Sequence, residues 1–429
     1  MRSFLRGIGC RQPIGDCNMV HTQFTTLLRR NIDFVDQHAY WDHSKGLGNK
    51  EWDLPYGFHG RSALKPLRFI DQNYAIPCYG AYFATTRNSG KPYFVSEYNF
   101  LFPNRHRSEG GLYFGAIAAL QGWDGALRMG YVVTKDDVFA DSLIKGNMCA
   151  SDPISQATER QIKFLYLRGD MREAEISVSL HGTSDAVAEN WYLGGEAAAL
   201  SFIGKIGLSV GDSAPDGYIL PLTTNAVISG KRIVPFAASP DTADAALWLE
   251  SLKGGLIPAG NKSDLNRGLI ETATREARFN FNEGTIAVNT PRTKGWVIKT
   301  NGTYEMPGVS AAVAAKECSL TFSSLDGSAL SESRRVLIMF PTDAINTGMK
   351  FGSDERTVLI HWGGAPVLVR VGSAAVTFRN DNRMKLFALS TTGRRTGEVP
   401  AHVADGNLKF TLAHGSKEGV VLNWELAAE

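Results

Sequence analysis

The pattern of apolar residues changes near residue 170, and this change constrains the fold more than any other feature of the sequence. Before that point, short apolar runs alternate with longer amphipathic stretches, which is typical of β/α units with parallel strands. After it, short alternating runs are separated by Gly, Asn, Asp and Pro, as in β-sandwiches. We therefore expect an α/β plus all-β chain, with an α/β part at 1–170, a β-rich connector or small domain at 171–275, and a β-sandwich domain at 276–429.

Four β/α units fit into the first part. Strands are expected near Gln12–Cys17, Ile32–His38, Tyr93–Glu97 and Ala126–Val132. Helices are expected at Thr22–Arg30, within Leu64–Arg87, at Gly110–Trp123 and at Ile154–Leu167, the last of them after the capping pair Asp152-Pro153. Farther along, we expect a helix at Thr242–Leu252 and sandwich strands that include Ala174–Leu180, Thr285–Asn289, Val336–Phe340, Lys385–Leu389 and Val420–Leu426.

Charge and cysteine content exclude several classes of function. The chain has 45 Lys+Arg against 43 Asp+Glu, so its charge of +2 offers no field for nucleic acid or an anionic membrane. Five scattered cysteines without a Cys-x-x-Cys pair predict neither a zinc site nor a disulfide framework, and we expect no metal or other cofactor. The residues after Arg2 and Arg6 lack the apolar run of a signal peptide, which predicts a cytoplasmic chain, although a longer parent enzyme could be secreted.

Polar side chains concentrate where two predicted strands end. The first run, Asp33–His43, reads Asp-Phe-Val-Asp-Gln-His-Ala-Tyr-Trp-Asp-His. His38 and Tyr40 are separated by one residue, so in an extended strand both point to the same side. Such clusters at the carboxyl ends of strands are what a barrel active site needs. The alternative is a strand end whose His and Tyr satisfy local hydrogen bonds.

The second run is Lys91–Phe100, in which an apolar strand ends at Glu97. A retaining glycosidase needs an ionised carboxylate that attacks the anomeric carbon and is held by neighbouring donors, and Tyr40 could be one of them. The alternative is a helix-capping or surface glutamate. Trp41, Trp123 and Asn99 are candidates for substrate binding, although single tryptophans are as often part of a core.

The order of these motifs resembles a known family. His38-x-Tyr40, Ser96-Glu97, and Leu-Gln-Gly-Trp-Asp-Gly at 120–125 resemble strands six, seven and eight of clan A glycoside hydrolases, which include cellulase-like and β-galactosidase-like retaining enzymes. The resemblance implies that Glu97 is the nucleophile and that His38 and Tyr40 orient it. The segments 164–170 and 289–296 resemble the barrel exit and the appended sandwich of larger members.

The family's acid/base, a glutamate in an Asn-Glu pair that ends strand four, has no counterpart in residues 1–170. The only such pair, Asn282-Glu283, falls in the predicted sandwich. A (β/α)8 barrel takes about 250 residues. The resemblance therefore implies the C-terminal half of a barrel, strands five to eight, whose acid/base comes from elsewhere. The expected partners are a carbohydrate substrate and either a separately encoded N-terminal half-barrel or a second copy that covers the open sheet edges.

Three other functions stay open at this stage. The chain could be a non-catalytic carbohydrate-binding or structural subunit, with Trp296, Trp362 and Trp424 as sugar-stacking candidates, although a core role fits these residues better. It could also be an inactive gene remnant. Finally, an altered enzyme could use Asp36, Asp42 or Glu109 as its acid, although Glu109 also fits a helix cap and Asp124 a turn.

Overall fold

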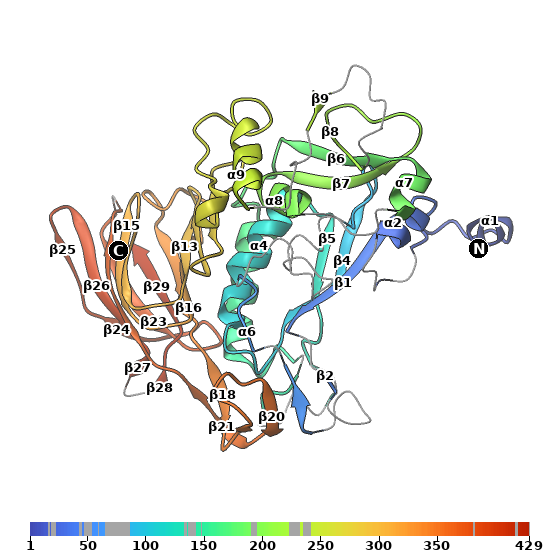
Figure 1. The fold of residues 1–429 in the computed structure, drawn as a ribbon. Coiled ribbons are helices and arrows are strands. Elements are labelled where there is room, and N and C mark those ends of the chain that lie inside the picture. The colour runs from blue at the N-terminus through green and yellow to red at the C-terminus, as the bar shows by residue number, and fades with distance from the viewer. Residues whose placement is uncertain are drawn as a thin grey trace.

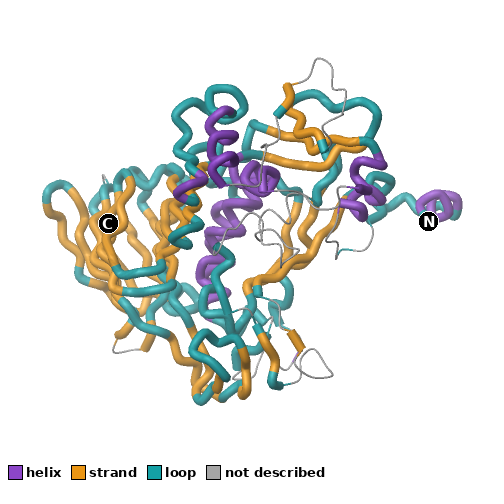
Figure 2. Tube along the Cα trace, in the orientation of Figure 1, coloured by secondary structure: helices purple, strands orange, loops and turns teal. Residues whose placement is uncertain are grey.

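The structure is a computed structural model with an α/β body and a β-sandwich (Figure 1). It describes residues 1–15, 18, 23–42, 45–46, 54–58, 60–64, 86–132, 135, 143–146, 148–189, 195–222, 232–234, 242–380, 382–416 and 419–428. Figure 2 shows one group of helices between the strand-rich sandwich and the parallel strands, and a second group beyond those strands, toward the N-terminus. No helix in these ranges combines the length and the apolar character needed to cross a bilayer.

The first part contains a three-stranded parallel sheet in the order β1-β4-β5. Its elements are α1 (Arg2–Gly7), α2 (Gln23–Arg29), β1 (Val35–Trp41), β4 (Tyr93–Phe100), η1 (Arg107–Glu109), α4 (Gly110–Gln121), β5 (Gly125–Arg128), α6 (Pro153–Ile162) and η2 (Lys163–Leu167). The Asp152 side chain accepts from the backbone N–H of Ile154 and caps α6, as the Asp-Pro pair predicts. The predicted β/α character is thus confirmed for these three strands.

Helix α4 is buried along its whole length, which explains its small residues. A Cβ atom at Gly111 would lie 2.9 Å from the Cβ of Gln161, so glycine lets α6 approach closely. Tyr113 packs edge-on against Phe279 of the sandwich sheet and also contacts Phe202. The helix is therefore the centre of a core that continues from the parallel sheet into the sandwich.

Two predicted elements of the first part differ from the structure. Among the described residues of Gln12–Cys17 there is no strand. Even so, Asp33 N donates to Ile14 O at 2.9 Å and His38 N donates to Asn18 O at 2.8 Å, so Ile14 and Asn18 lie beside β1 and the residues before it, in parallel order. Most of the helix expected within Leu64–Arg87 lies outside the described residues.

The middle part is a small α/β unit with a parallel sheet in the order β7-β6-β8-β9. It comprises β6 (Ser177–Gly182), α7 (Ser184–Glu189), α8 (Gly195–Ile203), β7 (Lys205–Val210), β8 (Tyr218–Pro221), β9 (Arg232–Ile233) and α9 (Thr242–Ser251). The prediction that Ala174–Leu180 is a sandwich strand is wrong, because β6 pairs in parallel with β7 and β8. Five of its six residues are buried, so it lacks the alternation that would mark its faces.

The C-terminal part is a sandwich of two antiparallel sheets. A nine-stranded sheet has the order β10-β11-β12-β13-β16-β17-β29-β23-β24, and a five-stranded sheet has the order β14-β15-β22-β26-β25. The larger sheet contains β10 (Leu269–Glu271), β11 (Ala277–Asn280), β12 (Thr285–Asn289), β13 (Thr293–Ile298), β16 (Cys318–Ser324), β17 (Arg335–Met339), β23 (Met384–Leu389), β24 (Arg395–Val399) and β29 (Asn423–Ala428). The smaller contains β14 (Gly302–Met306), β15 (Val309–Ala314), β22 (Ser373–Phe378), β25 (Ala401–Ala404) and β26 (Asn407–Ala413).

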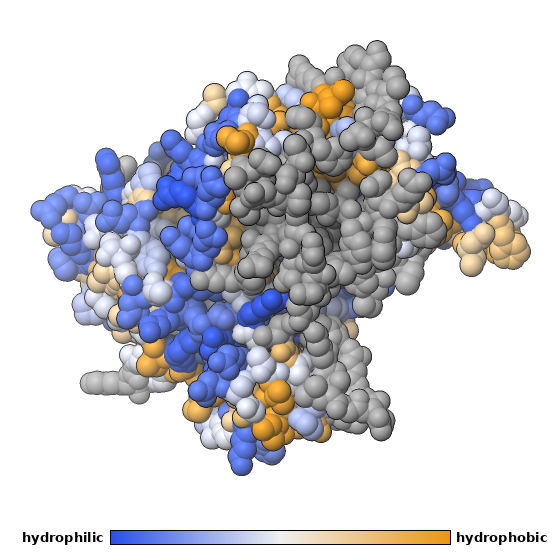
Figure 3. Space-filling view, viewed as in Figure 1, coloured by the Kyte–Doolittle hydropathy of each residue, from blue (hydrophilic) through white to orange (hydrophobic). Residues whose placement is uncertain are grey.

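The inner faces of the two sheets form one apolar core, which confirms the predicted all-β portion. Trp424 is only 1% exposed and Trp296 is also buried in this core. Their rings are therefore not available to stack on a sugar. Figure 3 shows the sandwich end of the molecule covered mainly by hydrophilic side chains.

A lower extension of the sandwich reaches back to the first part (Figure 1). It contains the hairpin of β18 (Ala344–Thr347) and β21 (Gly364–Val369), and a small sheet of β19 (Lys350–Phe351), β20 (Val358–His361), β3 (Tyr56–Gly57) and β2 (Lys45–Gly46). β20 pairs directly with β3, so strands from both ends of the chain share one sheet. Trp362 is half-buried here and its ring stacks on Phe102. Two further short strands, β27 (Gly415–Ser416) and β28 (Gly419–Val420), form a hairpin beside β29.

A buried arginine joins the two parts. Arg107 in η1 donates to Asp152 at the start of α6, over a distance of 2.7 Å, and to Asp343 of the sandwich, over 2.8 Å. A second junction lies at Asp170, which accepts from Thr293 and pairs with Arg292. Segments 164–170 and 289–296, which the sequence analysis singled out, therefore lie against each other.

Candidate active site

Glu97 lies on β4 next to the two side chains that sequence spacing places on one side of β1. The Tyr40 hydroxyl donates to Oε2 of Glu97. Nδ1 of His38 lies 3.1 Å from the same oxygen. Glu97 keeps 31% of its side chain exposed, whereas His38 is buried. The structure therefore brings together the three residues predicted to carry chemistry.

Burial and the neighbouring carboxylate act on Tyr40 in the same direction. Loss of hydration raises the pKa of the Tyr40 hydroxyl, and the hydrogen bond to Glu97 and its negative charge raise it further. The hydroxyl therefore stays protonated throughout the neutral range and remains a hydrogen-bond donor to Glu97.

An irregularity in β4 positions Ser96, a residue for which the sequence pattern predicted no role of its own. Gln37 pairs with Val95, but His38 pairs with Glu97, so Ser96 is an extra residue in β4. Its hydroxyl lies 2.8 Å from Nε2 of His38 and donates to Oδ2 of Asp36 at 2.7 Å. Asp36 is two residues before His38, and this spacing was the one available signal that it shares a face with His38 and Tyr40.

The three predicted substrate-binding residues have different surroundings. Trp41 is half-buried at the end of β1, where its indole N–H donates to Arg61 O at 2.9 Å. Asn99 is buried beside Tyr40, and its carbonyl accepts from Nε of Arg128 at 3.1 Å. Trp123 lies in the core against Tyr93 and Phe114, so its ring offers no face to a sugar. Trp41 alone keeps the partial exposure that sugar stacking requires.

The carboxylates considered as alternative acids have structural partners. Oδ2 of Asp42 accepts from the Gly60 N–H at 2.6 Å within the protein interior. Glu109 is buried and binds Ser62 and Lys299, and it makes no side-chain hydrogen bond that caps α4. Asp124 accepts from the Tyr93 N–H at 2.8 Å, which fits its expected role in a turn.

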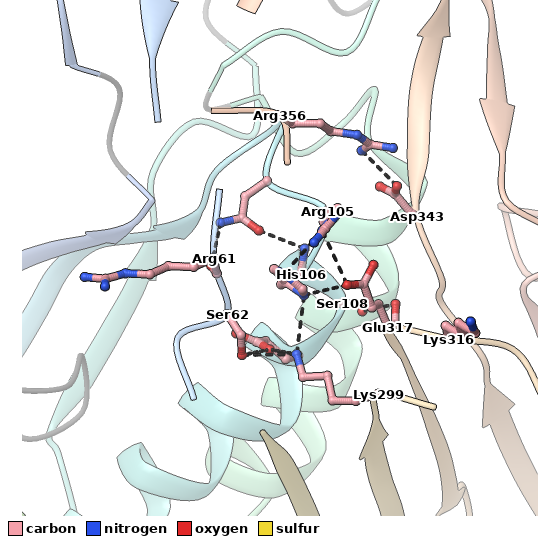
Figure 4. A network of polar contacts seen from close by, with 12 residues as sticks. Arg61, Ser62, Arg105, His106, Ser108, Lys299, Lys316, Glu317, Asp343 and Arg356 are labelled. Atoms are coloured by element: carbon pink, nitrogen blue, oxygen red, sulfur yellow. Dashed lines mark hydrogen bonds and ion pairs between the residues drawn. The ribbon is translucent and has the colours of Figure 1, made fainter. Parts of the chain in front are cut away.

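Figure 4 shows the polar network around His106 and Lys299 at the junction with the sandwich. Lys299 donates to Glu109 at 2.7 Å and lies 3.4 Å from Nδ1 of His106. Burial, and then the positive charges of Lys299 and nearby arginines, lower the pKa of His106 to about 2. His106 is therefore neutral in the folded protein, and this network connects the two parts of the chain rather than forming a reaction centre.

The outer edge of β5 borders an apolar groove of about 830 Å³ between the sheet and α6. Its lining includes Tyr98, Leu127, Tyr131 and Leu167. Leu127 is 57% exposed and Leu167 is 73% exposed. In the described part of the chain, β5 pairs only with β4, so this side of the sheet is an open edge.

The described residues contain no group of three or more His, Cys, Asp or Glu side chains arranged to hold a metal ion. Comparison of the chain with protein-family models, curated proteins and solved structures gave no match.

Proposed function

We propose that this chain is the C-terminal half of a (β/α)8 barrel with an appended sandwich, derived from a retaining glycoside hydrolase that resembles clan A, and that Glu97 is its nucleophile. The observation that supports the proposal is the partly exposed carboxylate of Glu97, held by Tyr40 and His38 across two neighbouring parallel strands. A carboxylate at the mouth of a parallel sheet, with donors on one oxygen, is what glycosyl transfer to an enzyme requires.

The two oxygens of Glu97 would have different roles. Both Tyr40 and His38 contact Oε2, and within the described part of the chain Oε1 has no hydrogen-bond partner. Oε1 would form the bond to the anomeric carbon as the leaving-group oxygen departs with a proton from an acid. Water would then cleave the glycosyl ester and regenerate the carboxylate. Tyr40 and His38 stabilise the carboxylate at both the start and the end of this cycle.

The acid/base must come from outside the described residues. We propose that further β/α units add to the open edge of β5 and cover its groove, and that they supply the second carboxylate about 5 Å from Glu97. The exposed Leu127 and Leu167 fit such an addition, because a following strand and helix would bury them. A separately encoded half-barrel is the partner we favour, and a second copy of this chain is the alternative.

Covalent trapping tests the nucleophile without the missing acid. A 2-deoxy-2-fluoro glycoside with a dinitrophenolate leaving group needs no protonation of the departing oxygen, so the chain as it stands can react. We expect mass spectrometry to find one glycosyl adduct on the peptide that contains Glu97, in a panel of gluco-, galacto- and manno-configured probes. Glu97→Gln should abolish the adduct.

The matched control is Glu250→Gln, which removes an exposed carboxylate from α9 that pairs with Lys253 and should leave labelling unchanged. An adduct on another residue, or no adduct with any probe under conditions where the chain is folded, would contradict the proposal. The latter result would favour the structural-subunit or remnant interpretation.

A further inference from the structure

Asp36, Ser96, His38 and Glu97 form one continuous chain of hydrogen bonds. The Ser96 N–H donates to Oδ1 of Asp36 at 3.1 Å, and its hydroxyl donates to Oδ2 at 2.7 Å. The same hydroxyl oxygen lies 2.8 Å from Nε2 of His38. On the other side of the ring, Nδ1 lies 3.1 Å from Oε2 of Glu97. Both ring nitrogens are therefore engaged.

A count of hydrogens determines what the ring must carry. Ser96 has one hydroxyl hydrogen, and with an ionised Asp36 that hydrogen is directed to the carboxylate. The Ser96 oxygen is then an acceptor, so Nε2 of His38 must bear a hydrogen. Oε2 of Glu97 already accepts from Tyr40, and a nitrogen lone pair that faced a carboxylate oxygen at 3.1 Å would be repelled. Nδ1 must therefore bear a hydrogen as well.

We infer that Asp36 and Ser96 are positioning residues that hold His38 as a doubly protonated imidazolium against the candidate nucleophile. The titratable groups that face the ring in the described structure are Glu97 directly and Asp36 through Ser96, with Tyr40 on the same Glu97 oxygen. The Ser96 hydroxyl is thus the link through which Asp36 acts on His38.

This inference rests on the proposed function in one respect only, which is that Glu97 is taken to be the nucleophile. An imidazolium beside Oε2 places a positive charge where the carboxylate regains its negative charge as the glycosyl ester is cleaved. No proton is transferred in this role. The extra residue in β4 is essential to it, because it sets Ser96 and Glu97 against opposite nitrogens of one ring.

Nitrogen-15 spectra of the ring can test the inference in the full chain. The protein has nine histidines, so a His38→Gln variant identifies the relevant signals. At pH about 6, where imidazole charge is readily observed, we expect both nitrogens of His38 to carry hydrogen. In Asp36→Asn, the new amide donates to Ser96, and the Ser96 hydrogen turns to the ring. The Nε2 resonance should then move to the position of an unprotonated ring nitrogen, while Nδ1 keeps its hydrogen.

Two further variants separate this role from a general structural one. Ser96→Thr keeps the hydroxyl and should retain the wild-type spectrum. Asp33→Asn removes a carboxylate that precedes β1 and pairs with Arg2 and Arg6, and it should leave the His38 signals unchanged.

An unchanged Nε2 signal in Asp36→Asn would overturn the inference. So would a wild-type ring that has only one hydrogen at that pH. The spectra require no turnover, so the link between Asp36 and His38 can be present in a chain that forms no glycosyl adduct. Conversely, an adduct can form on Glu97 even if the hydrogens on His38 do not depend on Asp36. The two proposals therefore fail independently.

Discussion

At the scale of single residues, burial separates side chains of the same type into different roles. His38 and His106 are both largely buried, yet His38 lies between Ser96 and Glu97, whereas His106, although 3.6 Å from Glu317, lies among Lys299, Arg105 and other cations. The same contrast applies to glutamate. Glu97 is partly exposed and lies against Tyr40 and His38, whereas Glu109 is buried and pairs with Lys299. The surroundings, rather than the residue type, distinguish the candidate site from the junction.

The neutral state of His106 predicts an acid sensitivity of the fold. Its pKa is lowered to about 2 in the folded chain, against 6.5 without the fold, so between these values the unfolded chain binds more protons. The free energy of unfolding should therefore fall as pH decreases below 6.5. His106→Gln should weaken that dependence, as measured by urea midpoints at pH about 7 and about 5. Equal changes in the wild type and the variant would show that His106 does not carry the effect.

At the scale of elements, the candidate site lies on parallel strands, whereas residues beside antiparallel strands form the junction between the two parts. β1 and β4 carry Tyr40, His38 and Glu97 on neighbouring strands. Residues directly beside antiparallel strands instead contribute to the junction: Lys299 follows β13 and Asp343 precedes β18. Tight turns then stabilise the sandwich locally. Asp326, between β16 and β17, accepts from the backbone N–H of Arg334 and from Ser324 and Ser333.

The turn at Asp326 gives a second prediction about pH. Burial alone would raise the pKa of Asp326, but the hydrogen bonds from Arg334, Ser324 and Ser328 outweigh it and lower the pKa from 3.8 to about 2. This stabilisation is present above pH 3.8 and is lost as pH falls toward 2. Asp326→Asn should cost about 1 kcal/mol near neutral pH, once screening of this exposed group is allowed for. Denaturant midpoints should converge with those of the wild type near pH 2, and a constant gap would contradict the assignment.

At the scale of the whole molecule, the sandwich and the α/β body are joined through buried charge. Arg107 is almost inaccessible and bridges Asp152 of the body and Asp343 of the sandwich. Among the described residues the α/β body has an open edge at β5, and α1 lies at the end of the body far from the sandwich (Figure 1). Phe4 in α1 and Ile8 just after it are exposed. The sandwich therefore packs against one side of the body, and the exposed apolar residues beside β5 and near α1 lie on other sides.

Removal of the bridging cation should weaken this join. Arg107→Met leaves two buried carboxylates without their shared partner, and we expect a loss of about 3 kcal/mol or more in the free energy of unfolding. Lys409→Met removes an exposed cation that pairs with Asp405 and should leave the stability nearly unchanged. Equilibrium unfolding in urea measures both. Similar small losses in the two variants would mean that the buried bridge does not hold the parts together.

By itself, the sequence determined the features that depend on local spacing. The alternation in Asp33–His43 placed His38 and Tyr40 on one side of a strand, and the apolar run before Glu97 predicted β4. The apolar runs before residue 170 predicted β/α units, and the spacing of short strands after about residue 275 predicted the antiparallel sandwich. The parallel sheet of β6 to β9, after residue 170, was not predicted. The predicted features follow from the periods of strands and helices, which any short window of sequence contains.

Only the tertiary structure decided the features that depend on contacts between distant segments. The extra residue at Ser96 appears only when β4 pairs with β1, so the link from Asp36 to His38 has no signature in either segment alone. Trp123 is buried because it packs against Tyr93 and Phe114. Strand β6 pairs in parallel because its partners are strands that follow it in the chain. The physical reason is common to all three: register and burial are properties of pairs of elements, whereas periodicity is a property of one.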